Sequence, residues 1–201
     1  MNKSLTDRVF SLPKRLRPYF LYDRSLLAKL SQCAWKVLSC YLEHGVSLED
    51  PKPAAIIAVQ TFGDFLNFNP HLHIIATDGC FGKDGSFMTG IVPNASHLEP
   101  LFRLEVLKML KREGKITDAV IENMDSWYHS GFHVFCGDAI RFDDEDGLER
   151  LAQYVIRAPI SQERKLYIPA ELTGSGIAQV IYTGKNSRVK EQFTAPCLRK
   201  P

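Results

Sequence analysis

Two apolar stretches near the middle of the chain decide its fold: Pro53–Phe62, which reads PAAIIAVQTF, and His71–Thr77, which reads HLHIIAT. Each has the length and the apolar content of a β-strand. Between them lie the turn-forming residues Gly63, Asp64, Asn67, Asn69 and Pro70. Two strands joined by so short a loop pair most simply as antiparallel neighbours. The sequence therefore predicts a sheet at the centre of the chain.

Further strands and helices are predicted on both sides of this pair. The predicted strands are Arg8–Leu12, Ser86–Val92, Phe132–Phe142 with a bulge at Gly137, Lys165–Ile168 and Ile177–Thr183. The predicted helices are Asp23–His44, Ser96–Arg112, Thr117–Tyr128 and Gly147–Arg157. Gly45 ends the first of them, a Ser96–Glu99 capping box begins the second, and the acidic run 143–146 precedes the last. The expected fold class is α+β, with helices packed on a central antiparallel sheet.

Composition places the chain among soluble globular proteins. It has 201 residues, 45% of them hydrophobic and 24% charged, which excludes a disordered or collagen-like chain. The net charge of +2 is too near neutral to indicate nucleic-acid binding by itself. Five scattered cysteines without a C-x-x-C pair argue against a disulfide framework or a zinc knuckle. No apolar run reaches the length of a signal peptide or a membrane span, so we expect a cytoplasmic protein.

The triplet His71-Leu72-His73 is the first candidate site. Alternate residues of a strand project to one face, so both imidazoles can bind a single divalent metal, although the triplet taken alone favours a structural role. Gln60, at the end of the preceding strand, or Asp64 could supply a third, oxygen ligand; Gln60 is otherwise an ordinary strand-end residue. Two histidines and one oxygen suit a catalytic Mg²⁺ or Mn²⁺ better than a closed zinc site. His129 and His133 are further candidates or simple strand-edge residues.

Tyr154 is the second candidate. In the predicted helix Gly147–Arg157, it lies about 110° from the centre of an apolar stripe formed by Leu148, Leu151, Ala152 and Val155. A phenol there is either a packing residue or, beside a metal, a nucleophile toward phosphorus. Arg157, one helical turn away, could favour such an attack. The basic cluster Lys14, Arg15 and Arg17 is either a solvated turn or part of a DNA-binding surface.

Longer motifs around these residues are similar to those of a known family. They are Gln60-Thr61-Phe62-Gly63, Leu66-Asn67-Phe68-Asn69-Pro70-His71-Leu72-His73, Asp78-Gly79, Leu110-Lys111-Arg112-Glu113-Gly114, the segment Trp127–Val134 and the segment Gly147–Pro159. Together they resemble the HUH-type (histidine, hydrophobe, histidine) transposases of rolling-circle insertion sequences, including the common-region elements. The matches run from about Leu12 to Phe193 in the family's order.

The resemblance implies a metal-dependent single-strand DNA endonuclease and strand transferase on a ferredoxin-like palm. His71 and His73 would hold Mg²⁺ or Mn²⁺, with Gln60 as the third ligand. Tyr154 would attack the scissile phosphodiester, giving a 5′-phosphotyrosine link and a free 3′-hydroxyl. The implied partner is single-stranded DNA at insertion-sequence ends and targets. The expected DNA contacts are Arg157, Lys14, Arg15 and Arg17.

The sequence differs from the usual pattern of this family at two points. Arg150 occupies the position four before Tyr154, where some relatives carry a second tyrosine, so the chain resembles the single-tyrosine branch. Relatives usually have a zinc module before the Leu12 region and more sequence after the equivalent of Phe193. Residues 1–201 are therefore expected to form one catalytic domain of a truncated transposase. The alternatives are a DNA-binding remnant without turnover and an HUH nuclease of the replication-initiator or relaxase type.

Overall fold

The computed structural model describes residues 3–63, 67–90, 92–155, 165–174, 176–183 and 190–194. The chain divides into two compact units. The larger consists of Met1–Thr61 and Asn69–Ile156, and the smaller of Phe62–Phe68 and Arg157–Pro201. Within the described ranges, no helix combines the length and the apolar character needed to cross a membrane.

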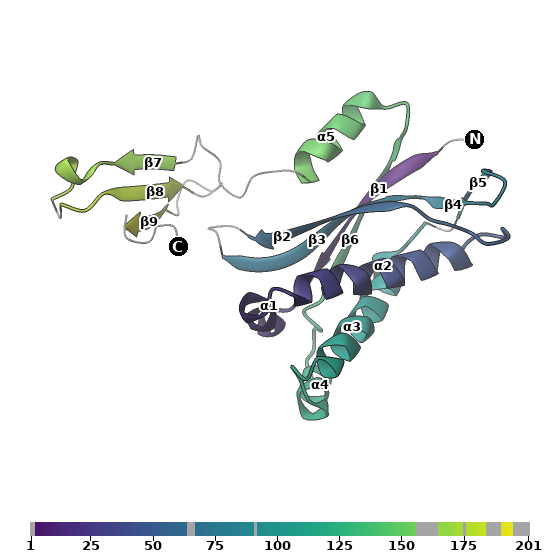
Figure 1. Ribbon diagram of the computed structural model, residues 1–201, viewed down its shortest axis with the longest axis horizontal. Coiled ribbons are helices and arrows are strands. Elements are labelled where there is room, and N and C mark those ends of the chain that lie inside the picture. The colour runs from purple at the N-terminus through teal and green to yellow at the C-terminus, as the bar shows by residue number, and fades with distance from the viewer. Residues whose placement is uncertain are drawn as a thin grey trace. The chain divides into compact units, whose positions relative to one another are not determined.

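The larger unit carries most of the secondary structure (Figure 1). Its elements are β1 (Ser4–Ser11), the 3₁₀ turn η1 (Lys14–Leu16), α1 (Arg17–Tyr22), α2 (Leu26–His44), β2 (Ala55–Phe62), β3 (Phe68–Thr77), β4 (Gly79–Phe81), β5 (Phe87–Thr89), α3 (Ala95–Arg112), α4 (Asp118–Asp125), β6 (His133–Arg141) and α5 (Glu145–Val155). The ends of β2 and β3 nearest the connecting loop fall in the smaller unit.

A four-stranded sheet in the order β2-β3-β1-β6 forms the centre of this unit. Strand β1 is antiparallel to both of its neighbours, so that Val9 lies opposite His73 on one side and Phe135 on the other. Helices α2 and α3 cover one face, called here the helical face, and α5 lies over the other, the α5 face (Figure 1). The predicted α+β class, with helices on a central antiparallel sheet, is confirmed.

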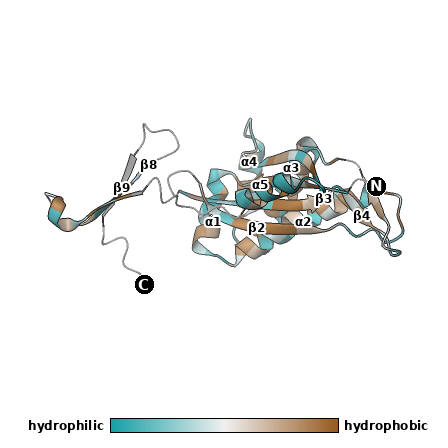
Figure 2. Cartoon of the chain, turned by 90° about the horizontal axis from the view of Figure 1, so that it is seen from above, coloured by the Kyte–Doolittle hydropathy of each residue, from teal (hydrophilic) through white to brown (hydrophobic). Residues whose placement is uncertain are grey.

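The main core lies between the helical face and α2 and α3. Phe10 and Leu72 are paired across β1 and β3, and both are fully buried. The Phe10 ring meets the Phe102 ring edge to face at 4.9 Å, and Phe102 meets Phe132 at 5.9 Å. Figure 2 shows brown, hydrophobic colouring along β2 and teal on parts of α3 and α5. Burial of each such large side chain stabilises the fold by about 1.5–3 kcal/mol.

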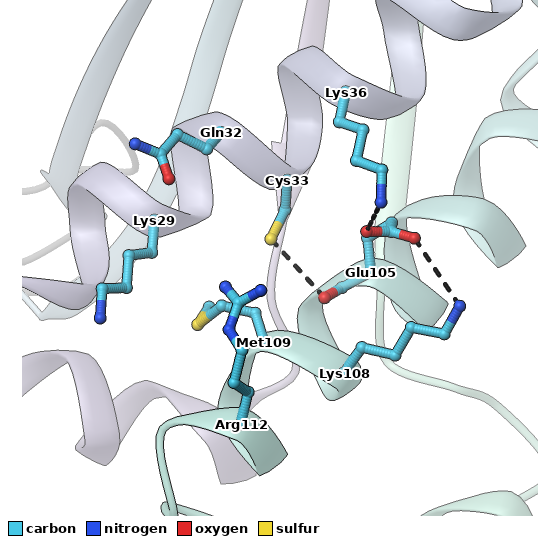
Figure 3. Close-up of a pocket in the computed structure, with 8 residues that line it drawn as sticks. All are labelled: Lys29, Gln32, Cys33, Lys36, Glu105, Lys108, Met109 and Arg112. Atoms are coloured by element: carbon cyan, nitrogen blue, oxygen red, sulfur yellow. Dashed lines mark hydrogen bonds and ion pairs between the residues drawn. The ribbon is translucent and has the colours of Figure 1, made fainter.

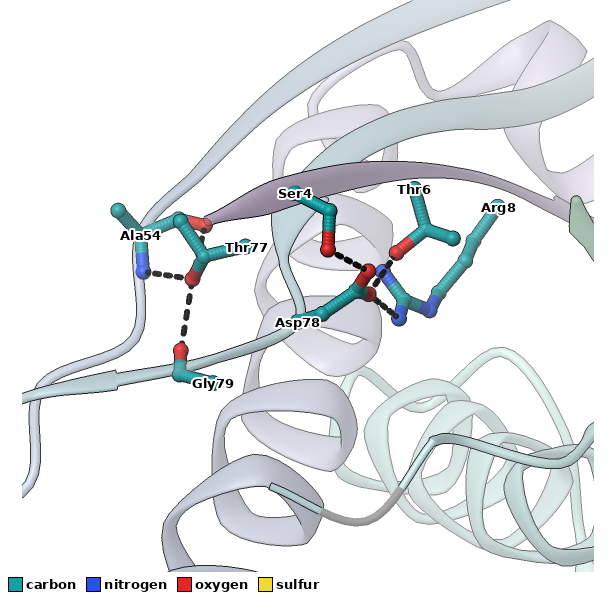
Figure 4. Close-up of polar contacts among 7 residues, drawn as sticks. All are labelled: Ser4, Thr6, Arg8, Ala54, Thr77, Asp78 and Gly79. Carbon is teal, nitrogen blue, oxygen red and sulfur yellow. Dashed lines mark hydrogen bonds and ion pairs between the residues drawn. The ribbon is translucent and has the colours of Figure 1, made fainter. Parts of the chain in front are cut away.

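A buried polar cluster lies at one end of the helical face (Figure 4). Asp78 accepts hydrogen bonds from Ser4 Oγ at 2.8 Å, from Thr6 Oγ1 and from Arg8 Nη2 at 3.2 Å. Arg8 and Asp78 are almost completely buried. Burial lowers the pKa of the Arg8 guanidinium, and the Asp78 carboxylate opposes that shift. The pair therefore joins β1 to the end of β3 without placing an uncompensated charge in the core.

The start of α5 agrees with its acidic sequence. Asp144 Oδ1 accepts a hydrogen bond from Gly147 N at 2.9 Å, as expected of an acid at a helix start. A Cβ at position 147 would lie 2.3 Å from Asp144 Oδ2 and 2.9 Å from Ile140 Cγ2, so a larger residue would clash with the capping side chain and with β6. The predicted bulge at Gly137 is also confirmed, because the β1–β6 register shifts between Thr6 and Arg8 beside it.

The start of α3 differs from its prediction. The Asn94 side chain caps this helix by accepting from Ser96 N at 2.9 Å, so the predicted Ser96–Glu99 capping box is wrong. The cap lies two residues earlier because the asparagine oxygen already satisfies an amide of the first turn. Helix α4 ends at Asp125 rather than at Tyr128.

Three strand predictions also need correction. Strand β1 begins at Ser4, four residues before the predicted Arg8. Strand β3 begins at Phe68, so Asn69 and Pro70 belong to the strand and not to the turn; Pro70 lies outside the paired register with β1 and needs no ladder amide there. The predicted strand Ser86–Val92 is reduced to β5, which pairs with β4 in a separate two-stranded sheet.

The smaller unit is a three-stranded antiparallel sheet in the order β7-β8-β9. Its elements are β7 (Lys165–Ile168), η4 (Ala170–Leu172), β8 (Gln179–Thr183) and β9 (Lys190–Thr194). The predicted short strands in this part of the chain are confirmed, with β8 starting two residues later than expected.

Candidate active site

Strand β3 presents His71 and His73 together on the α5 face. Leu72 and Ile74, which alternate with them, are buried on the helical face. The two imidazole ring centroids are 5.1 Å apart, and the rings are tilted 67° to each other. Because His71 lies opposite Ser11 and His73 opposite Val9, both imidazoles stand over the junction of β3 and β1.

The His71 ring is held by the backbone of its own strand. Its Nδ1 lies 2.8 Å from the carbonyl oxygen of Asn69, to which it donates, so the Nε2 atom keeps its lone pair. Burial lowers the pKa of His71, the hydrogen bond to the Asn69 carbonyl oxygen opposes this shift, and the electrostatic interactions with His73 and Arg17 lower the pKa further. The neutral imidazole that a metal ion requires is therefore favoured near neutral pH.

His73 is more deeply buried and has an unusual neighbour. Only 3% of this residue is exposed, and its Nδ1 lies 3.9 Å from Asp7 Oδ1. Neither of these two buried atoms has a hydrogen-bond partner. The side-chain oxygen of Asn69, two residues before His71, is also buried without a partner. Buried polar atoms are rarely left unpaired, so this concentration beside two histidines is typical of a functional site.

Helix α5 carries Tyr154 to the same place. Leu151 and Val155 are buried, whereas Ala152, predicted to lie in the apolar stripe, is exposed. The Tyr154 ring meets the His73 ring edge to face, with centroids 4.9 Å apart and planes at 85°. Tyr154 is 48% exposed, so its side chain contacts His73 and is also accessible to a ligand from solvent.

Gln60 joins the edge strand β2 to α5. Its Nε2 donates to the carbonyl oxygen of Val155 at 2.8 Å, one residue beyond Tyr154. This hydrogen bond fixes the Gln60 amide group and leaves Oε1 as the atom that can coordinate a metal. The structure therefore brings Gln60, His71, His73 and Tyr154 to one face, although the hydrogen bond gives Gln60 a structural role as well.

The donor set of this face fits a metal with open coordination positions. Within the described parts of the chain, no three His, Cys, Asp or Glu side chains form a metal-binding group. Among the described residues, the candidates for a third protein ligand beside His71 and His73 are the amide oxygens of Gln60 and Asn69. Two imidazoles and an amide oxygen can accept Mn²⁺ or Mg²⁺ while leaving positions for water or phosphate.

The basic cluster lies where β1 leaves the sheet, just after Ser11. Lys14 and Arg15 are exposed, whereas Arg17 is partly buried and donates to the Leu12 carbonyl oxygen at 3.3 Å from both Nε and Nη2. Burial lowers the pKa of Arg17. These cations are thus adjacent to the His71 end of the site. The predicted contact Arg157 and the alternative ligand Asp64 lie outside the described residues.

The two remaining histidine candidates lie apart from the imidazole pair. His133 is exposed at the start of β6, opposite Ser11. His129 is exposed in the preceding loop, where its ring meets that of Tyr128 at 4.5 Å.

Asp7 and Asn69 were not among the predicted site residues. Asp7 alternates with Val9 and Ser11, so a strand extended to Ser4 would have put its carboxylate on the histidine face. Asn69 was assigned to a turn, where asparagine is common. Its spacing of two from His71 is the signal that was available.

A hollow between α2 and α3, about 310 Å³ in volume, contains none of the predicted site residues (Figure 3). Its basic side chains are paired with acids: Lys36 lies 2.7 Å from Glu105, and Lys29 lies 2.5 Å from Glu113. Burial is the main reason why the pKa of Cys33 in this hollow is raised to about 11. Paired charges and an unreactive thiol do not indicate an active site.

Comparison with protein families identifies this chain. Residues 54–196 match the family described as "Putative transposase", and the match includes β2, β3, β6 and α5. The chain therefore belongs to this transposase family. Neither the curated proteins nor the solved structures give a match.

Proposed function

We propose that this transposase-family chain cleaves and rejoins single-stranded DNA through Tyr154, in the manner of an HUH-type nuclease of the single-tyrosine branch. The edge-to-face contact of Tyr154 with His73, at 4.9 Å, is the observation that carries the proposal. It brings together the proposed nucleophile and one of the two proposed metal ligands, which lie 81 residues apart in the sequence. A phosphate between them would be within reach of both.

The proposed chemistry is a transesterification. The Tyr154 hydroxyl oxygen forms a bond to the scissile phosphorus, and the bond from phosphorus to the 3′-oxygen breaks. The phenolic proton passes to solvent, to which the side chain has access, and the leaving oxygen takes up a proton to become a 3′-hydroxyl. The 5′-phosphotyrosine keeps the phosphoester, so a second strand's 3′-hydroxyl can reverse the step without ATP. Such an exchange is what DNA transposition requires.

His71, His73 and Gln60 would hold Mg²⁺ or Mn²⁺, with Asn69 as another source of an amide oxygen. When bound, the cation would act as a Lewis acid toward the phosphate oxygens. Asp7 would accept the proton of His73 Nδ1, which orients the ring and keeps Nε2 available. Asn69 does the same for His71 through its carbonyl oxygen.

The proposed substrate is single-stranded DNA at insertion-sequence ends and target sites, transposed by a rolling-circle route. Lys14, Arg15 and Arg17 would contact its phosphates next to the His71 end of the site, and Arg157 would do so near Tyr154. Such contacts are independent of base sequence and weaken with salt.

A DNA-cleavage assay tests the proposal. The chain is incubated with Mn²⁺ and a 3′-labelled single-stranded oligonucleotide pool of randomised sequence, then run on a denaturing gel. A labelled covalent adduct is expected, and it should disappear with EDTA and in the His71→Ala and His73→Ala variants. His44→Ala is the matched control, because His44 lies at the end of α2, where its ring contacts Cys40 of the same helix.

Two results would overturn the proposal. An adduct that persists in the His71→Ala/His73→Ala double variant would separate the chemistry from the histidines. Binding of the pool without any adduct in the unmodified chain would indicate a DNA-binding protein that does not turn over.

A further inference from the structure

The α5 face continues beyond the histidines onto the edge strand β6. The registers of β3 and β6 against β1 create two rows of side chains that cross the sheet on this face. The rows are His71, Ser11 and His133, and His73, Val9 and Phe135. At the usual strand spacing, the β6 member of each row lies about 10 Å from its histidine on β3.

Phe135 is unusual because it is a large aromatic residue that the core does not use. Its neighbour Val134 is buried on the helical face, whereas Phe135 is 51% exposed on the α5 face. Its ring lies along its own strand toward Gly137, where a Cβ would come within 3.5 Å of Phe135 Cε1. His133, two residues earlier on the same face, is exposed as well.

Positive charge borders the same end of β6. Gly131, with φ of +70°, packs against Pro13, where a Cβ at position 131 would come within 2.8 Å of Pro13 Cβ. This contact places the segment that enters β6 beside the segment that carries Lys14 and Arg15, both exposed. Aromatic rings next to exposed cations are the combination that binds single-stranded nucleic acid, because the rings stack on bases and the cations contact phosphates.

We infer that Phe135 and His133 form a stacking surface for bases of single-stranded DNA next to the scissile phosphate. The inference rests on the proposed function, because it takes the DNA at Tyr154 to continue across β1 toward β6. The surface recognises base faces and not base edges, so it tolerates many sequences. It positions the strand and takes no part in the bond exchange.

Binding of the randomised single-stranded pool, measured by fluorescence anisotropy with Mn²⁺ in a Tyr154→Phe background, tests the inference. Phe135→Ala should weaken binding about 5- to 100-fold, since stacking on one base has that effect. Phe135→Leu should weaken it similarly, and Phe135→Trp should restore it. Phe142→Ala is the matched control, because Phe142 is 47% exposed just beyond the far end of β6.

The outcomes separate the two proposals. If the Phe135→Ala or Phe135→Leu variant binds as tightly as the Phe142→Ala variant, the stacking surface is wrong, whatever the cleavage assay gives. If binding depends on an aromatic residue at position 135 while the unmodified chain forms no adduct, the stacking surface stands and the proposed cleavage fails.

Discussion

The two faces of the four-stranded sheet use the same strands for opposite purposes. On the helical face, β1 and β3 contribute Phe10 and Leu72 to a closed core, and the buried Arg8 is paired with Asp78 through Nη2, although its Nε and Nη1 have no hydrogen-bond partner. On the α5 face, the same strands contribute Asp7 and His73, whose facing atoms lie 3.9 Å apart without a hydrogen bond. The closed apolar core therefore lies on the helical face, and the candidate catalytic side chains lie on the α5 face.

The largest predicted effect breaks the core on the helical face. Phe10→Ala should lower the free energy of unfolding by about 3–5 kcal/mol, because it removes a fully buried ring that packs on Phe102. Val9→Ala, one residue away on the α5 face, should cost about 1 kcal/mol, since Val9 is only partly buried. Urea denaturation followed by circular dichroism measures both. Equal losses would contradict the division between the faces.

The next effect concerns the buried ion pair. Asp78→Ala should destabilise the fold by about 3–5 kcal/mol, because it leaves the Arg8 charge buried and unpaired. The double variant Arg8→Met/Asp78→Leu should recover much of this loss, since it removes the uncompensated charge. The same denaturation measurement compares the free energies of unfolding of the two variants. A double variant less stable than Asp78→Ala would show that the pair itself is favourable.

A smaller effect is expected from Asp7 on the α5 face. Asp7→Asn should weaken Mn²⁺ binding about 10- to 100-fold, because it removes the negative charge of the carboxylate that lies 3.9 Å from His73 Nδ1. Asp138→Asn, an exposed carboxylate on β6, is the control and should not change the affinity. Isothermal titration calorimetry compares the two variants. Equal affinities would remove Asp7 from the site.

The smallest effect is a pH dependence due to His71. Since burial lowers its pKa in the folded chain, the unfolded chain binds a proton below pH 6.5 that the folded chain does not. The free energy of unfolding should therefore fall as the pH drops from 6.5 toward the folded pKa. His71→Gln should flatten this part of the profile, measured by urea titration over that range without metal. An unchanged slope would mean that His71 is not the group responsible.

Local sequence patterns were sufficient to predict much of the fold and of the candidate site. Period-two alternation in HLHIIAT placed both histidines on one face, and the apolar spacing of α5 predicted a helix with Tyr154 on the flank of its buried face. The acidic run before α5 and the bulge at Gly137 also followed from local chemistry. These features depend on neighbours in sequence, so sequence reasoning could reach them.

Tertiary contacts account for what was missed. Ser4–Asp7 is too polar to be predicted as a strand, and it becomes one because Ser4 and Thr6 bond to Asp78 while the backbone pairs with β3 and β6. The Asp7 carboxylate beside His73 follows from that extension. The exposed position of Phe135 was also beyond prediction, since it depends on which face α5 covers.

The covalent link of DNA to Tyr154 is the central claim, and peptide mapping tests it most directly. After reaction of the chain with single-stranded DNA and Mn²⁺, nuclease trimming and trypsin digestion, mass spectrometry should find a residual nucleotide on the peptide Leu151–Arg157, which contains Tyr154 as its only tyrosine. The Tyr154→Phe variant should carry none. A nucleotide on a peptide that contains Tyr128 or Tyr182, or an adduct that persists in Tyr154→Phe, would contradict the account.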